Sequence, residues 1–363
     1  MDKKLFYVTS WNKNKESTWS GTTYSLYKAL THYFNVIDVP VPVEKPSLIY
    51  KIFKKMGFSK NDLGLHFFKK QRHAANEILN KYKGPHLIFQ FFELFNDSSL
   101  NKTCIYIDAP VCVLKNLERD SPTIYYNLFV NDANALSIRN NSQMGYFNSC
   151  SAIFTMGKWI RKALIGEGIN PEKIVHVGGG INLDKNHIDY SLKQGNKFLF
   201  VGRDFKRKGL AIVYDAFCLI KKKNPNVELH VAGPQDDPYP QHIDGYYFYG
   251  DCHHGKLEKL FNKCDVFCMP SYYEAYGLVF IEALVYGLPC IGRNCNEMPY
   301  FIEDGFTGYL VNNDDIHNMA AKMLNLLSNK NVISEVRARR DKYITEYSWD
   351  TVANRIYDTL KNM

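Results

Sequence analysis

The sequence predicts an α/β protein with two domains, and three observations support this prediction. First, the chain has 363 residues, more than a single domain of ordinary size contains. Second, short apolar runs alternate with helical segments, which is typical of a parallel sheet covered by helices. Third, three consecutive glycines, Gly178 to Gly180, separate two such series, because the alternation restarts after them.

The first series places two candidate site residues where strands end. An apolar strand at 5–9 leads through a turn with Gly21 to a helix at 24–33 and a strand at 36–39. Further strands are expected at 86–92, 103–108, 151–156 and 173–177, with a helix from 158 to about 168. Ligands bind at the carboxyl ends of strands in open α/β sheets, so Gly21 and Asp108 are candidates. Asp108 equally suits a capping residue for the next segment.

The second series opens with a basic loop between a strand and a helix. Strands are expected at 197–201, 227–233, 245–250 and 266–269, and helices at 210–223 and 257–261. The loop from Gly202 to Gly209 follows the first of these strands and contains four basic residues. A basic loop that runs into a helix N-terminus is suited to bind a diphosphate, and Arg203 and Lys208 are its candidate ligands.

The stretch 270–289 carries two carboxylates around a predicted helix. Leu278, Ile281 and Val285 fall on one helical face, and Gly287 and Pro289 end the helix. Glu282 lies inside this apolar face, where a carboxylate is costly unless it is paired. Glu274 precedes the helix, whose free N–H groups favour an anionic ligand. The spacing therefore indicates a ligand that has both a phosphate and hydroxyl groups.

This stretch resembles the Glu-seven-residues-Glu signature of retaining family 4 glycosyltransferases of the GT-B type. The similarity includes Pro-Ser at the start, the Glu-Ala-Tyr-Gly-Leu block and the Glu-Ala-x-x-x-Gly-Leu-Pro end. It extends over nearly the whole chain and is firmest from about 150 to 312. It implies two Rossmann-like domains facing across a cleft: residues 1–178 with a returning C-terminal helix at 346–363, and residues 179–345.

The resemblance also implies roles for individual residues. Arg203 and Lys208 would bind the donor diphosphate, Glu274 the sugar hydroxyls and Glu282 the ribose, while the loop near Tyr249 would hold the base. Asp108 would face the sugar or the acceptor, in a catalytic set with Glu274, Arg203 and Lys208. The full set of expected donor-binding residues is Gly21, Gly202, Arg203, Lys208, Tyr249, Glu274, Ala275, Tyr276, Gly277, Leu278 and Glu282.

The resemblance implies a retaining glycosyltransferase that transfers a sugar from a nucleotide-diphosphate sugar to an acceptor. The sugar is expected to be a hexose. The acceptor is expected to belong to surface polysaccharide, lipopolysaccharide or glycolipid synthesis. No Asp-x-Asp is placed to hold a metal ion, so cationic side chains are expected in its place, without a cofactor. One alternative is a nucleotide-sugar epimerase of the same architecture, which lacks the Glu-Ala-Tyr-Gly-Leu pattern. The other is a non-catalytic basic polymer-binding protein, which the net charge of +8 allows, although no nucleic-acid-binding motif is present.

The sequence favours a cytoplasmic location, with a possible surface for membrane contact left open. No apolar run approaches 18 residues, and the run after Lys4 is too short for a signal peptide. Nine cysteines without a Cys-x-x-Cys pair are typical of a reducing compartment. Residues 51–83 interleave basic with large apolar side chains. This stretch is either a solvated helical face or a surface that touches anionic lipid, where a lipid-linked saccharide would be the acceptor.

Overall fold

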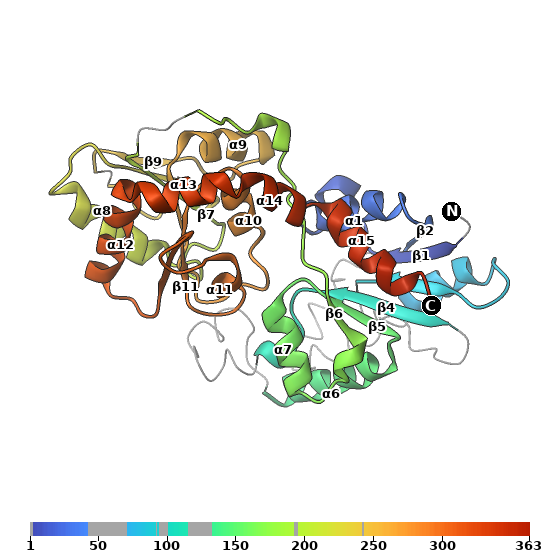
Figure 1. The fold of residues 1–363 in the computed structure, drawn as a ribbon. Coiled ribbons are helices and arrows are strands. Elements are labelled where there is room, and N and C mark those ends of the chain that lie inside the picture. The colour runs from blue at the N-terminus through green and yellow to red at the C-terminus, as the bar shows by residue number, and fades with distance from the viewer. Residues whose placement is uncertain are drawn as a thin grey trace. The chain divides into compact units, whose positions relative to one another are not determined.

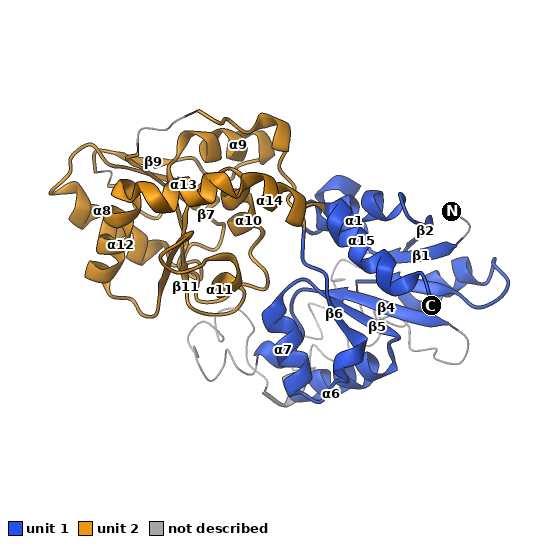
Figure 2. Ribbon diagram, viewed as in Figure 1, with its two compact units in different colours: residues 1–179, 349–363 blue, residues 180–348 orange. Residues whose placement is uncertain are grey.

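The computed structural model describes residues 3–42, 71–91, 93, 101–114, 133–191, 195–241 and 243–363. The chain forms two compact units, unit 1 with residues 1–179 and 349–363 and unit 2 with residues 180–348 (Figure 2). Most of the basic stretch 51–83, and Tyr125-Tyr126 after Asp108, lie outside the described residues.

Unit 1 is built around a parallel sheet of six strands in the order β2-β1-β3-β4-β5-β6 (Figure 1). Its strands are β1 (Lys4–Thr9), β2 (Asn35–Pro40), β3 (Leu87–Gln90), β4 (Lys102–Ile107), β5 (Ala152–Thr155) and β6 (Ile174–His176). Its helices include α1 (Thr22–Leu30), α6 (Ala133–Ser149) and α7 (Lys158–Gly166), and a 3₁₀ segment covers Lys15–Gly21. The inner strands β1, β3, β4 and β5 are buried over most of their length, because both faces of a parallel sheet are covered, whereas the edge strand β2 is partly exposed and includes Asp38.

Unit 2 repeats this plan with a six-stranded parallel sheet in the order β12-β11-β10-β7-β8-β9. Its strands are β7 (Lys197–Val201), β8 (Glu228–Ala232), β9 (Tyr246–Phe248), β10 (Val266–Cys268), β11 (Cys290–Arg293) and β12 (Gly308–Val311). Its helices are α8 (Leu210–Lys221), α9 (His254–Lys263), α10 (Leu278–Val285), α11 (Met298–Phe301), α12 (Ile316–Ser328), α13 (Lys330–Ala338) and α14 (Arg340–Glu346), with a 3₁₀ turn at Lys185–His187. Two doubly wound α/β units confirm the predicted fold class.

Strands β11 and β12 were not predicted from the sequence. Each has four residues and includes a glycine, so neither shows a clear apolar or alternating pattern. The glycine of β12, Gly308, is pressed against the main chain of Cys290 so closely that a Cβ would overlap its carbonyl. The short strands are therefore fixed by tertiary packing, which single-sequence patterns do not report.

The order of the strands in unit 2 sets the place of the candidate site. The chain leaves β7 in one direction across the sheet and returns to the other side of β7 at β10. The loops that follow β7 and β10 therefore diverge from a shared point at the carboxyl edge of the sheet. Ligands of open α/β sheets bind at this topological switch point. The two loops are residues 202–209 and residues 269–277.

The last helix, α15 (Trp349–Leu360), belongs to unit 1 although it follows unit 2 in the sequence. It packs against α1 (Figure 1), with Val352, Ala353 and Ile356 fully buried. The ring of Tyr357 stacks on Tyr33 at a centroid distance of 5.1 Å. This packing confirms that the C-terminal helix returns to the first unit.

Within the described part of the chain, no helix combines the length and the apolar character that crossing a membrane requires.

Candidate functional site

The two loops at the switch point of unit 2 are joined through Arg207. Its main-chain carbonyl accepts a hydrogen bond from Tyr272 N at 3.0 Å. Its guanidinium donates in the opposite direction, to the carbonyl oxygen of Tyr273. One residue of the first loop thus satisfies polar groups of two consecutive residues in the second, Tyr272 and Tyr273. The pair of loops behaves as one unit rather than as two mobile segments.

Glycine allows the close approach of these loops. Gly209 has φ of +76°, and a Cβ at this position would lie 2.6 Å from the carbonyl oxygen of Pro270. Any other residue would be strained there and would push the loops apart. Gly209 also precedes α8, so the same residue starts the helix and permits the loop contact.

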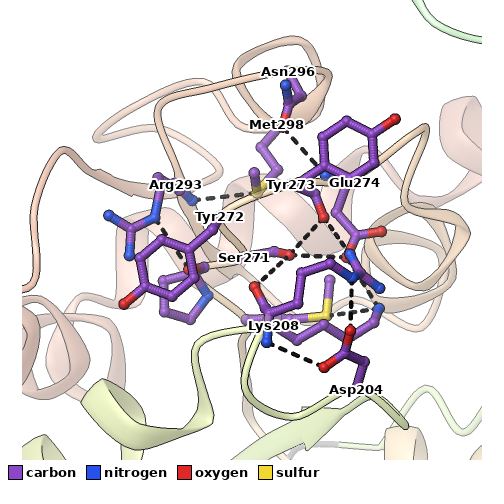
Figure 3. Close-up of polar contacts among 12 residues, drawn as sticks. Asp204, Lys208, Ser271, Tyr272, Tyr273, Glu274, Arg293, Asn296 and Met298 are labelled. Atoms are coloured by element: carbon purple, nitrogen blue, oxygen red, sulfur yellow. Dashed lines mark hydrogen bonds and ion pairs between the residues drawn. The ribbon is translucent and has the colours of Figure 1, made fainter. Parts of the chain in front are cut away.

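The carboxylate of Glu274 collects three donors on one oxygen. Its Oε1 lies 3.0 Å from Arg207 Nη1, 3.1 Å from Lys208 Nζ and 3.0 Å from Ser271 Oγ. Figure 3 shows Lys208, Ser271 and Glu274 gathered between the two loops. Among the described residues, no group donates a hydrogen bond to Oε2. One oxygen of this carboxylate is therefore held in place while the other retains its capacity to accept bonds from a ligand.

The surroundings keep Glu274 ionised. Burial would raise the pKa of this carboxyl group, but the positive charges of Lys208 and Arg207 outweigh it and leave the pKa below its ordinary value. Only 9% of the side chain is exposed, so these charges act in a medium that screens them poorly. The main chain at this point is fixed as well, since the N–H of Glu274 donates to Asn296 Oδ1 at 3.2 Å.

Lys208 reaches Glu274 by crossing over a glycine. A Cβ at Gly202 would overlap the middle of the Lys208 side chain, so glycine at this position leaves the path open. The ammonium group ends 3.4 Å from Met269 Sδ, and the side chain is only 14% exposed. An ammonium has three donors. The bond to Glu274 uses one and the contact with the sulfur another, so a third remains.

Arg203, the other predicted cation, lies on the surface of unit 2. It makes a two-pronged bond to Asp251, with Nε and Nη2 each 3.1 Å from a carboxylate oxygen. Arg203 is 78% exposed and Asp251 57%, so this ion pair is weak and easily exchanged. By contrast, the guanidinium of Arg207 is 19% exposed and also pairs with Asp204 at 3.2 Å. Arg207 and Lys208 are thus the fixed cations of the loop, whereas Arg203 is free to change its partner.

Glu282 lies on α10 with its side chain buried, as its place in the apolar face predicts. Burial raises the pKa of this carboxyl group to about 7, against the lowering effects of a bond from the Asn182 N–H and of the charge on Lys208. Lys208 therefore acts on Glu274 and on Glu282. The structure brings these three predicted residues together from a loop before α8, a loop before α10 and the body of α10.

The start of α10 supplies the remaining predicted residues of this loop. Gly277 has φ of +96° and precedes the first helical residue, Leu278, without a side-chain cap. The first N–H groups of the helix are therefore left for another acceptor. Ala275 is half-buried, whereas Tyr276 is buried and its ring packs edge-on against Phe301 at 5.0 Å. Tyr276 thus supports the loop, and its main chain is the part that a ligand would meet.

Tyr249 lies just after β9, and its polar groups all have partners. Its hydroxyl bonds to His230 Nδ1 at 2.9 Å, and His230 Nε2 bonds to Glu228 at 2.9 Å. Burial lowers the pKa of His230 to about 4, so the ring is neutral at pH 7 and receives from Tyr249 while it donates to Glu228. The Tyr249 carbonyl accepts from Lys256 Nζ at 2.9 Å. These bonds therefore fix the position of the Tyr249 side chain and main chain next to the loop at 250–251.

Gly21 and Asp108 belong to unit 1 and lie at the carboxyl edge of its sheet. Gly21 follows Trp19 and Ser20, and all three have positive φ, at 91°, 47° and 55° respectively. Such a run is rare outside glycine and marks a tightly constrained loop after β1. Asp108 is half-buried and comes directly after β4. Both positions agree with their predicted places at strand ends.

Comparison with known proteins identifies the family of unit 2. Residues 184–347 match the family model described as glycosyl transferases group 1. Unit 2 belongs to this family.

Relatives and solved structures extend the comparison beyond unit 2. The chain is 26% identical over 213 residues to a phosphatidyl-myo-inositol mannosyltransferase of Mycolicibacterium smegmatis, a match that covers 56% of this chain and 55% of the relative. The chain thus spans about half the length of that curated relative. The structure of WaaG, a glycosyltransferase involved in lipopolysaccharide biosynthesis, is similar with a TM-score of 0.67 and 14% identity, covering 99% of this chain and 100% of WaaG. The pneumococcal O-GlcNAc transferase GtfA, solved with UDP and GlcNAc, is similar with a TM-score of 0.60 and 18% identity, covering 81% and 60%. These similarities establish the GT-B fold.

Three residues of the candidate site in unit 2 were not singled out from the sequence. Arg207 was one of four bases in a loop, and nothing in the pattern says which base turns inward. Asn296 was not among the predicted site residues, yet its side-chain amide oxygen accepts from the main-chain N–H of Glu274, and its φ is +52°. Asp251 pairs with Arg203 across two loops. A positive φ at an asparagine is a local signal, but the contacts of Arg207 and Asp251 depend on tertiary structure.

Proposed function

We propose that this protein is a retaining glycosyltransferase that transfers a sugar from a nucleotide-diphosphate sugar to a saccharide or lipid-linked saccharide acceptor. The observation that carries the proposal is the Glu274 carboxylate at the switch point, with Oε1 held by Arg207 and Lys208 and Oε2 available. A carboxylate fixed in this way is suited to accept bonds from sugar hydroxyls. The family of unit 2 supports the same conclusion.

In this proposal the donor diphosphate lies beside the loop at 202–209 and the N-terminus of α10. When the bond between the sugar and the diphosphate breaks, negative charge develops on the leaving diphosphate. The third donor of Lys208, the guanidinium of Arg203 and the uncapped N–H groups of α10 would stabilise that charge. Because the site supplies cationic and N–H donors of its own, we propose that the reaction needs no added metal ion or cofactor.

Arg203 would act by changing its partner. Its pair with Asp251 is exposed on both sides, so a diphosphate with two charges competes well for the guanidinium. Lys208 and Arg207 would stay in place, because both are mostly buried and hold Glu274. This division gives the site a rigid part for the sugar and an adaptable part for the diphosphate.

Glu282 would hold the ribose of the nucleotide. Ribose hydroxyls donate hydrogen bonds to a carboxylate, and such bonds favour its ionised form. They would therefore lower the raised pKa of Glu282 and release a proton when the donor binds near pH 7. Tyr249 would lie beside the base. In unit 1, Gly21 would contact the donor phosphate, and Asp108 would contact the acceptor or the sugar.

The acceptor class is inferred from the names of similar proteins. One is a phosphatidyl-myo-inositol mannosyltransferase, another takes part in lipopolysaccharide biosynthesis, and a third was solved with UDP. We therefore propose a lipid-linked saccharide as the acceptor and a uridine diphosphate sugar as the first donor to test. A cytoplasmic enzyme on the inner face of a membrane would suit a lipid-linked acceptor.

The test is a panel of nucleotide-diphosphate sugars, with release of the nucleoside diphosphate as the readout. We expect the wild-type protein to release it from at least one donor, and Glu274→Gln to lose this activity while it remains folded. The anomeric configuration of the product, read by proton NMR, decides between retention and inversion. Absence of release from every donor, with and without lipid extracts as acceptors, would contradict the proposal.

A further inference from the structure

Unit 1 contains a basic cavity at the edge of its sheet opposite to Gly21 and Asp108. The cavity has a volume of about 430 Å³ and lies where β1, β3 and β4 begin, beside the end of α15. Four lysines line it: Lys3, Lys4, Lys83 and Lys102. No aspartate or glutamate side chain is among its lining residues. This edge carries none of the residues of the proposed transfer reaction.

Two of the four lysines have structural partners. Lys3 Nζ donates to the carbonyl oxygens of Leu360 at 2.7 Å and Lys361 at 3.3 Å, and Lys102 Nζ donates to the main-chain oxygen of Met363. Cations at a helix C-terminus interact favourably with its free carbonyls. These bonds stabilise the end of α15, and they also fix two positive charges at the cavity.

Among the described residues, the other two lysines have no anionic partner. In the described part of the chain, neither Lys4 nor Lys83 forms an ion pair, and Lys4 Nζ lies 5.4 Å from the ring centre of Tyr82. The charges of Lys3 and Lys102 are partly compensated by the main-chain oxygens of Leu360, Lys361 and Met363. The charges of Lys4 and Lys83 are exposed at the same cavity, where an anionic ligand would relieve their mutual repulsion.

The wall of the cavity is aromatic and rigid. Phe6 is buried, and it packs edge-on against Tyr82 at 5.0 Å and against the ring of His86 at 4.6 Å. The main chain of His86 is tied to the next strand, because its N–H donates to Asn101 Oδ1 at 2.9 Å and its carbonyl accepts from Lys102 N at 2.9 Å. The rings therefore form a preformed apolar face next to the lysines.

We propose that this cavity is a second ligand site, which binds an organic phosphate through Lys4 and Lys83. Lysine ammonium groups are general phosphate ligands, and the rings would contact the carbon skeleton of the same molecule. The volume suits a molecule of the size of a sugar phosphate or a phospholipid headgroup. This site is independent of the proposed transfer reaction.

Two binding experiments distinguish a soluble organic phosphate from a lipid headgroup. Calorimetry with glucose 6-phosphate, against glucose as the uncharged control, tests the soluble source. Co-sedimentation with phosphatidylcholine vesicles, with and without phosphatidylglycerol, tests the headgroup. We expect binding in at least one arm, weaker at high ionic strength because the lysines are exposed. Binding only to vesicles with phosphatidylglycerol would assign the lipid source, and binding of glucose 6-phosphate the soluble one.

The variant Lys4→Ala/Lys83→Ala should bind the same ligand about tenfold or more weakly, since two charge-assisted contacts are lost. Lys13→Ala/Lys28→Ala, which removes the same charge from exposed positions elsewhere in unit 1, should bind within about twofold of the wild type. Without ligand, Lys4→Ala/Lys83→Ala should unfold at the same or a higher temperature than the wild type, because repulsion is relieved. The proposal is overturned if the wild type binds neither ligand, or if both double variants bind equally well.

Discussion

Lys208 Nζ lies 3.1 Å from Glu274 Oε1, and this contact joins the two loops that diverge at the switch point of unit 2. Lys208 comes from the loop after β7 and Glu274 from the loop after β10, 66 positions later in the chain. The pair explains why a carboxylate with 9% exposure stays ionised. It also orients the carboxylate, since Oε1 is saturated and Oε2 is not.

Arg207→Ala should destabilise unit 2, whereas Arg203→Ala should not. Arg207 is mostly buried and bonds to Glu274, Asp204 and the Tyr273 carbonyl, so its loss leaves polar groups without partners and should cost about 2 kcal/mol. Arg203 has one exposed partner, and its loss should change stability by less than about 0.5 kcal/mol. Urea unfolding of both variants measures the difference. Equal unfolding midpoints would show that Arg207 does not hold the loops together.

Asp251→Asn should strengthen binding of the nucleoside diphosphate. The substitution removes the carboxylate that occupies Arg203 and leaves a neutral side chain of the same shape. Because the exposed pair contributes about 0–1 kcal/mol, the affinity should rise by up to about fivefold. Calorimetric titration of Asp251→Asn and the wild type provides the comparison, with Asp244→Asn as a control in the same unit. Weaker binding would mean that Asp251 orients Arg203 for the ligand instead of competing with it.

Glu282→Gln should change how the stability of the protein depends on pH. The pKa of Glu282 is raised to about 7 by burial, so the folded state keeps a proton that the unfolded chain loses near 4.5. Its contribution to stability is therefore full below about pH 4.5 and is lost as the pH rises to about 7, a change of roughly 3 kcal/mol. Gln cannot ionise, so the free energy of unfolding of the variant should rise relative to that of the wild type as the pH increases across this interval.

Urea unfolding of Glu282→Gln and the wild type at pH 5 and pH 8 measures whether the variant becomes more stable relative to the wild type at the higher pH. His230 acts in the opposite direction, since its pKa is lowered to about 4 by burial and its protonation destabilises the fold below about pH 6.5. Both proteins share that effect, so it cancels in their difference. A difference that is the same at both pH values would contradict a raised pKa at Glu282.

The two glutamates should differ in their kinetic effects. Glu282→Gln should mainly raise the donor KM, by about tenfold, because contacts to the ribose are the same in the ground and transition states. Glu274→Gln should lower kcat by roughly 10² or more, because the sugar changes charge and shape as its bond breaks and the fixed carboxylate no longer matches it. Steady-state kinetics with one donor separates the two. If both variants change kcat and KM alike, the glutamates do not have separate roles.

Much of this arrangement could be predicted from the sequence, and the rest could not for physical reasons. The apolar runs predicted ten of the twelve strands that the described residues form, because buried parallel strands are largely apolar along their length. Glu282 could be singled out, since a charge in an apolar helical face needs a partner. The inward turn of Arg207, the pairing of Arg203 with Asp251 and the amide of Asn296 at Glu274 could not. These contacts join segments far apart in the chain, and their energies depend on burial that only the folded unit defines.

The central claim, that a nucleotide-diphosphate donor binds at the Lys208–Glu274 pair, is tested most directly by calorimetric titration of three proteins with one nucleoside diphosphate. These are the wild type, Lys208→Ala and Lys206→Ala, which removes the same charge from an exposed position on the same loop. We expect the wild type and Lys206→Ala to bind within about twofold of each other and Lys208→Ala at least about tenfold more weakly, with circular dichroism showing all three folded. Equal binding by all three proteins, or no binding of any nucleoside diphosphate by the wild type, would contradict the account.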